Sequence, residues 1–203
     1  MTGPVRFTRS LAELPSFAFG NRSLTWWGVV GFMLIEGAGF AMAVASAIFL
    51  MNHELTWPPE PVMPPDQFFG TMFTIVILLS EIPNYLAKRA AEEGRLTEVR
   101  LLLVVMALAG VLLLIIRVFE FQHLNVSWTT NAYGSIVWLL LGLHTTHILT
   151  DWIDTLVLGA LMFTRHGKEG RRFVDTCENA IYWRFVWAAW LPIYLIIYLV
   201  PRW

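Results

Sequence analysis

The sequence predicts an all-α integral membrane bundle of five transmembrane helices. Of its 203 residues, 57% are hydrophobic and only 14% are charged, whereas an average soluble domain carries about 25% charged residues. The mean hydropathy is +0.59. The apolar residues fall into five runs, each long enough to cross a bilayer core, which takes about 20 residues of helix.

The five predicted helices follow one another through polar connections. They run over 25–51, 66–91, 97–120, 131–164 and 175–199. A proline-rich stretch, 57–65, separates the first two, and residues 92–95 break the chain before Thr97, which can cap the third helix. At 1.5 Å per residue the fourth helix is longer than a core of about 30 Å, so its far end should leave the membrane. A basic stretch, 165–172, precedes the fifth helix.

Basic residues predict the orientation of the bundle. Eleven of the 14 Lys and Arg residues fall in the N-terminal tail, between helices two and three, or between helices four and five. With five helices, all three segments lie on one side of the membrane. The positive-inside rule then predicts a cytoplasmic N-terminus and an outside C-terminus. We therefore expect a cytoplasmic tail over 1–24 and a single transmembrane domain over 25–203.

Charge and cysteine content exclude several classes of function. The net charge of −1 gives no reason to expect a nucleic-acid partner or an acidic substrate. The single cysteine, Cys177, cannot form an internal disulfide or a thiolate metal cluster.

Glu36 lies near the middle of the first predicted helix. A carboxylate at that depth costs at least about 2.5 kcal/mol, so it is either protonated or faces protein, water or a lipid headgroup. Gly37 and Gly39 allow a neighbouring backbone to come close. Two interpretations stay open: a group that exchanges protons, or a neutral glutamate hydrogen-bonded in a helix interface.

Two histidines lie three positions apart in the fourth helix, which puts His144 and His147 on one face. Such a pair can hold a metal, but the chain has only five histidines, and the other three fall in predicted loops. A structural or lipid-contacting pair is the favoured interpretation. Glu120 ends the third helix, where it either pairs locally with Arg117 or contacts a partner subunit.

Asp151 and Asp154 repeat the same spacing nearer the cytoplasm. Helices four and five should be antiparallel neighbours because a short loop joins them, which brings Arg184 to a similar depth. An intramembrane arginine seeks a carboxylate, so we predict an interhelical ion pair between Arg184 and Asp151 or Asp154. Glu178 is expected to open the fifth helix, where an acid suits the positive end of the helix dipole.

Several segments together resemble subunit three of the haem–copper oxidases, the cytochrome c and quinol oxidase group. The segments are the Glu36 helix, Trp57-Pro58-Pro59, Phe119-Glu120, Tyr133-Gly134-Ser135, the GxHxxH run over 142–147, and the aromatic run over 182–190. The resemblance extends from about Trp27 to the C-terminus. The chain looks like the five-helix form, which lacks the first two of the seven helices found in longer members.

The resemblance implies a non-catalytic subunit in a bacterial plasma (inner) membrane. It would dock on catalytic subunit one, in a complex with subunit two, and hold phospholipid in a cleft. It would bind no haem or copper itself, since these belong to the partner, and it would support proton uptake during sustained turnover. Glu36 matches the family's buried glutamate. Its recurring polar positions are matched by Glu120, His144, His147 and Glu178.

Two departures from the family pattern leave alternatives open. The family's usual His and Asp in the last helix are Arg184 and Trp187 here, and Asp151 and Asp154 lie outside its recurring polar positions. A relative associated with nitric oxide reductase is one alternative. Another is a small membrane enzyme or proton carrier that uses Glu36, His144 and His147, although the inverted repeats typical of carriers are not evident.

Overall fold

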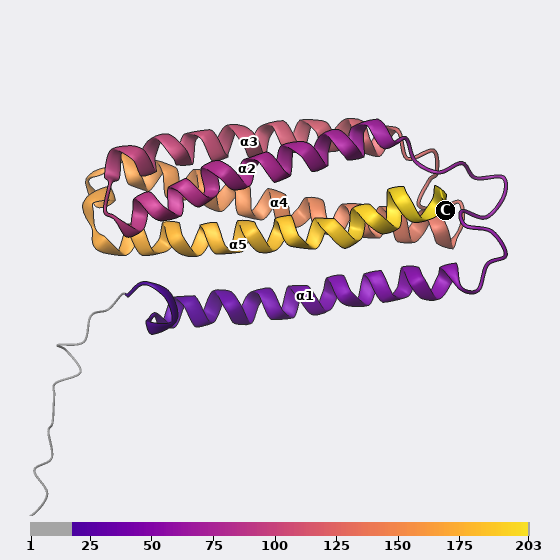
Figure 1. Ribbon diagram of the computed structural model, residues 1–203, viewed down its shortest axis with the longest axis horizontal. Helices are drawn as coiled ribbons and strands as arrows, with labels where there is room; N and C mark the ends of the chain where they lie inside the picture. The colour runs from indigo at the N-terminus through magenta and orange to yellow at the C-terminus, as the bar shows by residue number, and fades with distance from the viewer. Residues whose placement is uncertain (1–17, 203) are drawn as a thin grey trace, which may run out of the picture.

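A computed structural model describes residues 18–202, which contain five long helices and no strand (Figure 1). They are α1 (Leu24–Met51), α2 (Gln67–Glu92), α3 (Leu96–Gln122), α4 (Ala132–Phe163) and α5 (Gly170–Tyr194). A π-helical turn, Leu195–Leu199, and a 3-10 turn, Val200–Arg202, continue α5. All five helices are long and apolar enough to cross a membrane, which confirms the predicted fold class. Most of the predicted 1–24 tail, up to residue 17, and Trp203 lie outside the described residues.

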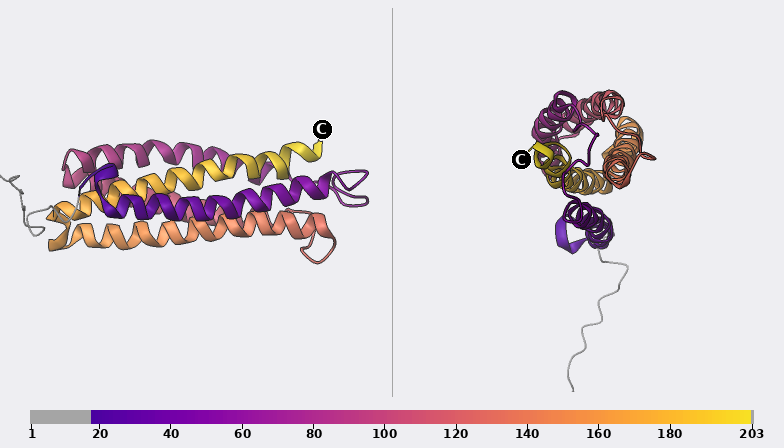
Figure 2. Two further views of the ribbon diagram at one scale, coloured as in Figure 1. Left: turned by 90° about the horizontal axis from the view of Figure 1, so that it is seen from below. Right: turned by 90° about the vertical axis from the view of Figure 1, so that its right-hand side faces the viewer.

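Helices α2 to α5 form a ring, and α1 lies outside it (Figure 2). Around the ring α2 contacts α3 and α5, while α4 contacts α3 and α5. Helix α1 packs against the side of the ring made by α4 and α5. This arrangement leaves α1 joined to the ring along one seam, and that seam is where the candidate site lies.

The helix ends follow from local sequence. Asn131 caps α4, because its side-chain oxygen accepts a hydrogen bond from the Gly134 backbone N–H at 2.8 Å. Helix α2 ends at Glu92, and Gly94, two residues further on, has a φ of 69°, which suits a residue without a side chain. The Gly94 and Arg95 backbone N–H groups donate to the carbonyls of Ala91 and Ala90. These two hydrogen bonds give partners to carbonyl groups in the last turn of the helix.

The core fills the inside of the ring. Large aromatic residues of α5 are fully buried there, among them Trp183 and Trp190. The Trp183 indole N–H donates to Ser80 Oγ at 3.0 Å, and the Trp190 indole N–H donates to Thr74 Oγ1 at 2.8 Å. Each tryptophan therefore buries its ring while its single polar atom is satisfied by α2.

When the π-helical turn that ends at Leu199 is counted with α5, the predicted helix bounds agree with the structure to within two residues, except at the start of the fifth helix. Helix α5 begins at Gly170 rather than at Asp175. Arg172 donates to the Asp175 carboxylate one turn on, at 2.7 Å, and this pair supports a helical turn outside the apolar run. Hydropathy detects the apolar stretch of a helix, so it missed this polar first turn.

Candidate functional site

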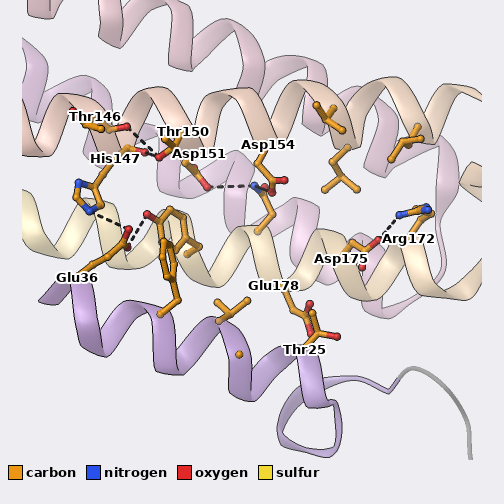
Figure 3. Close-up of a pocket in the computed structure, with 18 residues that line it drawn as sticks. Thr25, Glu36, Thr146, His147, Thr150, Asp151, Asp154, Arg172, Asp175 and Glu178 are labelled. Atoms are coloured by element: carbon orange, nitrogen blue, oxygen red, sulfur yellow. Dashed lines mark hydrogen bonds and ion pairs between the residues drawn. The ribbon is translucent and has the colours of Figure 1, made fainter.

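A cleft of about 710 Å³ lies between α1 and the pair formed by α4 and α5 (Figure 3). Its wall is mixed. The apolar part includes Val29, Phe32, Val157 and Leu161. The polar part is a row of side chains that begins at Glu36 and His147 and ends near Thr25 and Arg172: Thr25, Glu36, Thr146, His147, Thr150, Asp151, Asp154, Arg172, Asp175, Glu178, Asn179 and Tyr182. We refer to this space as the α1 cleft.

Glu36 connects the three helices around the α1 cleft. The Tyr182 hydroxyl of α5 donates to one carboxylate oxygen at 2.8 Å. The other oxygen lies 3.2 Å from His147 Nε2 on α4. Only 15% of the Glu36 side chain is exposed, so Glu36 lies in a helix interface. A position in a helix interface was part of one of the two interpretations that the sequence left open.

His147 is oriented by its own helix so that one ring nitrogen faces Glu36. His147 Nδ1 lies 2.6 Å from the Leu143 carbonyl oxygen, which only accepts, so Nδ1 carries a hydrogen. Nε2 then faces the Glu36 carboxylate oxygen at 3.2 Å, within ion-pair distance.

Asp151 and Asp154 are joined to α5 by an amide rather than by a cation. Asn179 Nδ2 donates to Asp151 Oδ1 at 3.3 Å and to Asp154 Oδ2 at 3.1 Å. Asp151 is buried, with 2% of its surface exposed, and its Oδ2 atom has no hydrogen-bond partner within 18–202. Asp154 is exposed along the α1 cleft.

The predicted pairing of Arg184 with Asp151 or Asp154 is wrong. Arg184 Nε and Nη2 donate to Glu81 Oε1 on α2, at 2.8 Å and 2.5 Å. The reason is rotation about the helix axis: five positions separate Arg184 from Asn179, which is about 140° around α5 at 3.6 residues per turn. Because α5 packs on α2 as well as on α4, Arg184 pairs with a carboxylate of α2 and not with one of α4.

Glu178 lies at the far end of the α1 cleft. It does not open the fifth helix as expected, because α5 begins eight residues earlier, at Gly170. The helix dipole therefore does not account for it. The Ser23 hydroxyl, just before α1, donates to its carboxylate at 3.3 Å.

Beyond the membrane-spanning segment, a hydrogen bond from His166 lowers the pKa of the Glu169 carboxyl.

Glu120 belongs to a separate buried cluster inside the ring. Arg117 Nη1 lies 2.6 Å from Glu120 Oε2, which confirms the local ion pair. The Tyr198 hydroxyl donates to Glu120 Oε1 at 2.5 Å. Arg117 and Glu120 are each 1% exposed, and the Arg117 guanidinium lies 3.7 Å from the centre of the Phe73 ring, a cation–π contact.

His144 completes this cluster and does not reach the α1 cleft. Arg117 Nη2 donates to His144 Nδ1 at 3.0 Å, and since arginine cannot accept, Nδ1 is bare. His144 Nε2–H then donates to the Val186 carbonyl at 3.0 Å. Three of the four ring nitrogens of His144 and His147 thus make hydrogen bonds, and the fourth, His147 Nε2, faces Glu36. Within residues 18–202 no three His, Cys, Asp or Glu side chains gather as metal ligands.

Sequence reasoning missed Asn179 and Tyr198 as parts of these sites and met Tyr182 only in the aromatic run. Asn179 and Tyr182 lie three positions apart, so they share the face of α5 that meets the α1 cleft. That spacing in an apolar helix was a usable signal. Tyr198 offered a weaker one, because tyrosines near helix ends are common at bilayer interfaces.

Comparison with known proteins identifies the family. The family model for cytochrome c oxidase subunit III matches residues 24–202, so the chain belongs to that family. Proteins named cytochrome c oxidase subunit 3 are similar to it. The one from Synechocystis sp. is 24% identical over 89% of this chain and 78% of its own length. The one from Bacillus subtilis is 25% identical over 89% and 86%. Against the one from Schizophyllum commune, 26% identical, this chain covers 62% of the relative's length.

The family and the five apolar helices define an accessory subunit of a terminal oxidase that crosses the membrane several times. The resemblance stated from the sequence is confirmed.

Proposed function

We propose that this chain docks on the catalytic subunit of a haem–copper terminal oxidase in a bacterial plasma membrane and holds phospholipid in the α1 cleft. In this role it supports sustained, proton-coupled oxygen reduction without binding haem or copper. The observation that carries the proposal is the α1 cleft itself, with one apolar wall and one polar row.

The shape and lining of the α1 cleft suit an amphiphile. Val29, Phe32 and Leu161 offer hydrocarbon to an acyl chain. At the end away from Glu36, Arg172 lines the cleft (Figure 3) and its buried Nε has no hydrogen-bond partner within the described residues. A phosphate oxygen is a strong acceptor for arginine. Positive-inside counting puts this end at the cytoplasmic surface, where a headgroup belongs.

Glu36 and His147 have a structural role in this proposal. Their contact fixes α1 against the ring, and α1 forms one side of the cleft. The contact between two titratable side chains also supports proton exchange as a second role for the pair. A complex related to nitric oxide reductase remains the alternative assembly, and the haem spectrum of the purified native complex separates the two.

Filling the α1 cleft tests the proposal. Gly28 lines it, and a Cβ at this position meets nothing within 4 Å, so Gly28→Phe introduces a ring at an open position of the cleft wall. Gly39→Phe is the matched control, because Gly39 is equally open on the same helix but does not line the cleft. We expect the Gly28 variant of the purified oxidase to lose bound phospholipid by mass spectrometry and to inactivate several-fold faster during turnover. A full lipid complement in an otherwise intact Gly28→Phe complex contradicts lipid binding in the cleft.

A further inference from the structure

We infer that the catalytic subunit seats against the outer face shared by α2 and α5, with the Glu81–Arg184 pair at the centre of the contact. We define the α2–α5 face by Leu78, Glu81, Ile82, Tyr85, Arg184 and Ala188. The partner it fits is a transmembrane helix that presents a hydrogen-bond acceptor at the depth of Arg184. The inference rests on the proposed function, which supplies the partner.

The Glu81–Arg184 pair lies within the membrane-spanning part of both helices. Glu81 is seven positions inward of Lys88, and Arg184 is twelve positions inward of Arg172. Their side chains are nevertheless 24% and 44% exposed. Charged groups at this depth face protein or water rather than lipid, so this exposed pair calls for a protein cover.

The hydrogen-bonding capacity left over at the pair indicates what the cover must offer. Both Glu81 oxygens are engaged within this chain, one by Arg184 and the other by Asn84 at 2.9 Å. Arg184 Nη1 makes no hydrogen bond to any residue of 18–202. The Glu81–Arg184 pair therefore has N–H donors without an acceptor among the described residues, whereas both of its carboxylate oxygens already accept a hydrogen bond. A partner carbonyl, hydroxyl or carboxylate is the complementary group.

The outer surface of α3 provides the contrast. Its large exposed side chains within the span are all hydrocarbon: Leu101, Val104, Val105, Leu108, Val111, Leu112, Ile115, Val118 and Phe119. Such a surface is suited to lipid tails and needs no protein cover. The seam between α1 and the ring already forms the α1 cleft. Of these three surfaces, the α2–α5 face alone carries an exposed arginine inside the membrane.

The surface shape of the α2–α5 face also suits the packing of a transmembrane helix from the partner. A hollow of about 400 Å³ beside the pair is lined by Leu78, Glu81, Ile82, Tyr85 and Leu86. On α5 the exposed residue one turn after Arg184 is the small Ala188, and small residues let membrane helices approach closely. A side chain from the partner can enter the hollow while its backbone lies over Ala188.

Site-specific crosslinking in native membranes tests the assignment. A photoreactive benzoylphenylalanine is placed at Ile82, which is 60% exposed on α2, and at Leu108, which is 66% exposed on α3, as the matched control. We expect Ile82 to crosslink to the catalytic subunit and Leu108 not to. Crosslinks to that subunit from Leu108 alone, or from neither site while the chain still co-purifies with the oxidase, overturn the assignment and leave the proposed function standing. A crosslink from Ile82 to a second copy of this chain also overturns it. Failure to co-purify with an oxidase overturns both.

A pair of double variants gives an independent readout. Glu81→Met with Arg184→Met removes both charges together, and Lys88→Met with Glu92→Met removes an ion pair at the end of α2 as the control. We expect the first variant to insert and fold with unchanged helix content, yet to be retained at least tenfold less in the purified oxidase. We expect the control to be retained normally. Equal retention of the two folded variants contradicts the inference.

Discussion

Glu36 Oε1 of α1 and His147 Nε2 of α4 lie 3.2 Å apart. The contact joins a helix outside the ring to a helix of the ring. The Tyr182 hydroxyl of α5 binds the other Glu36 oxygen at 2.8 Å, so one carboxylate holds three helices. The Glu36 carboxylate therefore has polar partners on both neighbouring helices inside the membrane.

Replacing Glu36 separates its shape from its charge. Glu36→Gln keeps a carbonyl for the Tyr182 hydroxyl and loses only titration, so we expect it to assemble and turn over like the wild type. Glu36→Leu leaves the Tyr182 hydroxyl without its acceptor and removes the group that faces His147 Nε2, which should destabilise the packing of α1 by about 1–3 kcal/mol. Limited proteolysis of the connection between α1 and α2 measures the loosening.

Ser46→Leu is the control for Glu36→Leu, because Ser46 is exposed on the same helix and bonds only to Met42 of its own backbone. It should leave proteolysis unchanged. A Glu36→Gln variant that assembles but loses activity at alkaline pH would show that Glu36 exchanges protons. Abolished turnover at every pH in that assembled variant would contradict an accessory role.

The Arg184–Glu81 pair predicts non-additive losses of stability. Arg184→Leu leaves Glu81 with Asn84 as its only partner, which should cost up to about 3 kcal/mol, the lower end for breaking a buried pair. The double variant Arg184→Leu with Glu81→Leu should recover most of that loss in thermal unfolding of the purified chain. Adding Asp151→Asn and Asp154→Asn to Arg184→Leu should give no such recovery. If the aspartate changes rescued stability instead, Arg184 would pair with the aspartates and not with Glu81.

The hydroxyl of Tyr198 should be worth more than that of an exposed tyrosine. It donates to Glu120 inside the ring, and hydrogen bonds to charged groups contribute about 1.5–3 kcal/mol. Tyr198→Phe should lower the thermal stability of the chain by that amount. Tyr85→Phe, at a side chain 52% exposed, should have little effect. Similar small losses at both positions would argue against an ionised Glu120.

Gly134 predicts a steric effect at the start of α4. A Cβ there would collide with the backbone carbonyl of Ser127, which cannot move as a side chain can. Gly134→Ala should destabilise the chain by about 1–3 kcal/mol, as overpacking does. At Gly142, in the same helix, a Cβ meets nothing within 4 Å, and Ala should stabilise by about 0.5–1 kcal/mol. Chemical unfolding of both variants in detergent measures the difference, and equal effects would refute it.

The fold was predictable because hydropathy and helix length act along the chain. The four helices that begin and end at the edge of their apolar runs were placed to within two residues. Only α5 extends further, through the polar turn that Arg172 and Asp175 stabilise. Neither the ring nor the position of α1 outside it followed from the sequence, because apolar helices can pack in many orders.

The site was predictable residue by residue but not in its groupings. Spacing on one helix put His144 and His147 on a shared face. In the structure His144 contacts Arg117, whereas His147 contacts Glu36. Depth matching chose the wrong partner for Arg184, since Glu81 on α2 lies at a suitable depth as well. Depth is set by position along a helix, whereas partners also depend on rotation about its axis and on which helices are neighbours.

The central claim, that this chain is an accessory subunit of a terminal oxidase, is tested most directly by removing it from the native complex. The measurement is oxygen consumption by the purified oxidase with and without the chain, followed from the first turnovers until activity decays, with haem content recorded in both samples. We expect the depleted enzyme to keep its haem spectrum and initial rate but to inactivate several-fold faster, and adding the chain back with phospholipid should restore its lifetime. Equal lifetimes with and without the chain, or loss of haem and of all initial activity on its removal, would contradict the account.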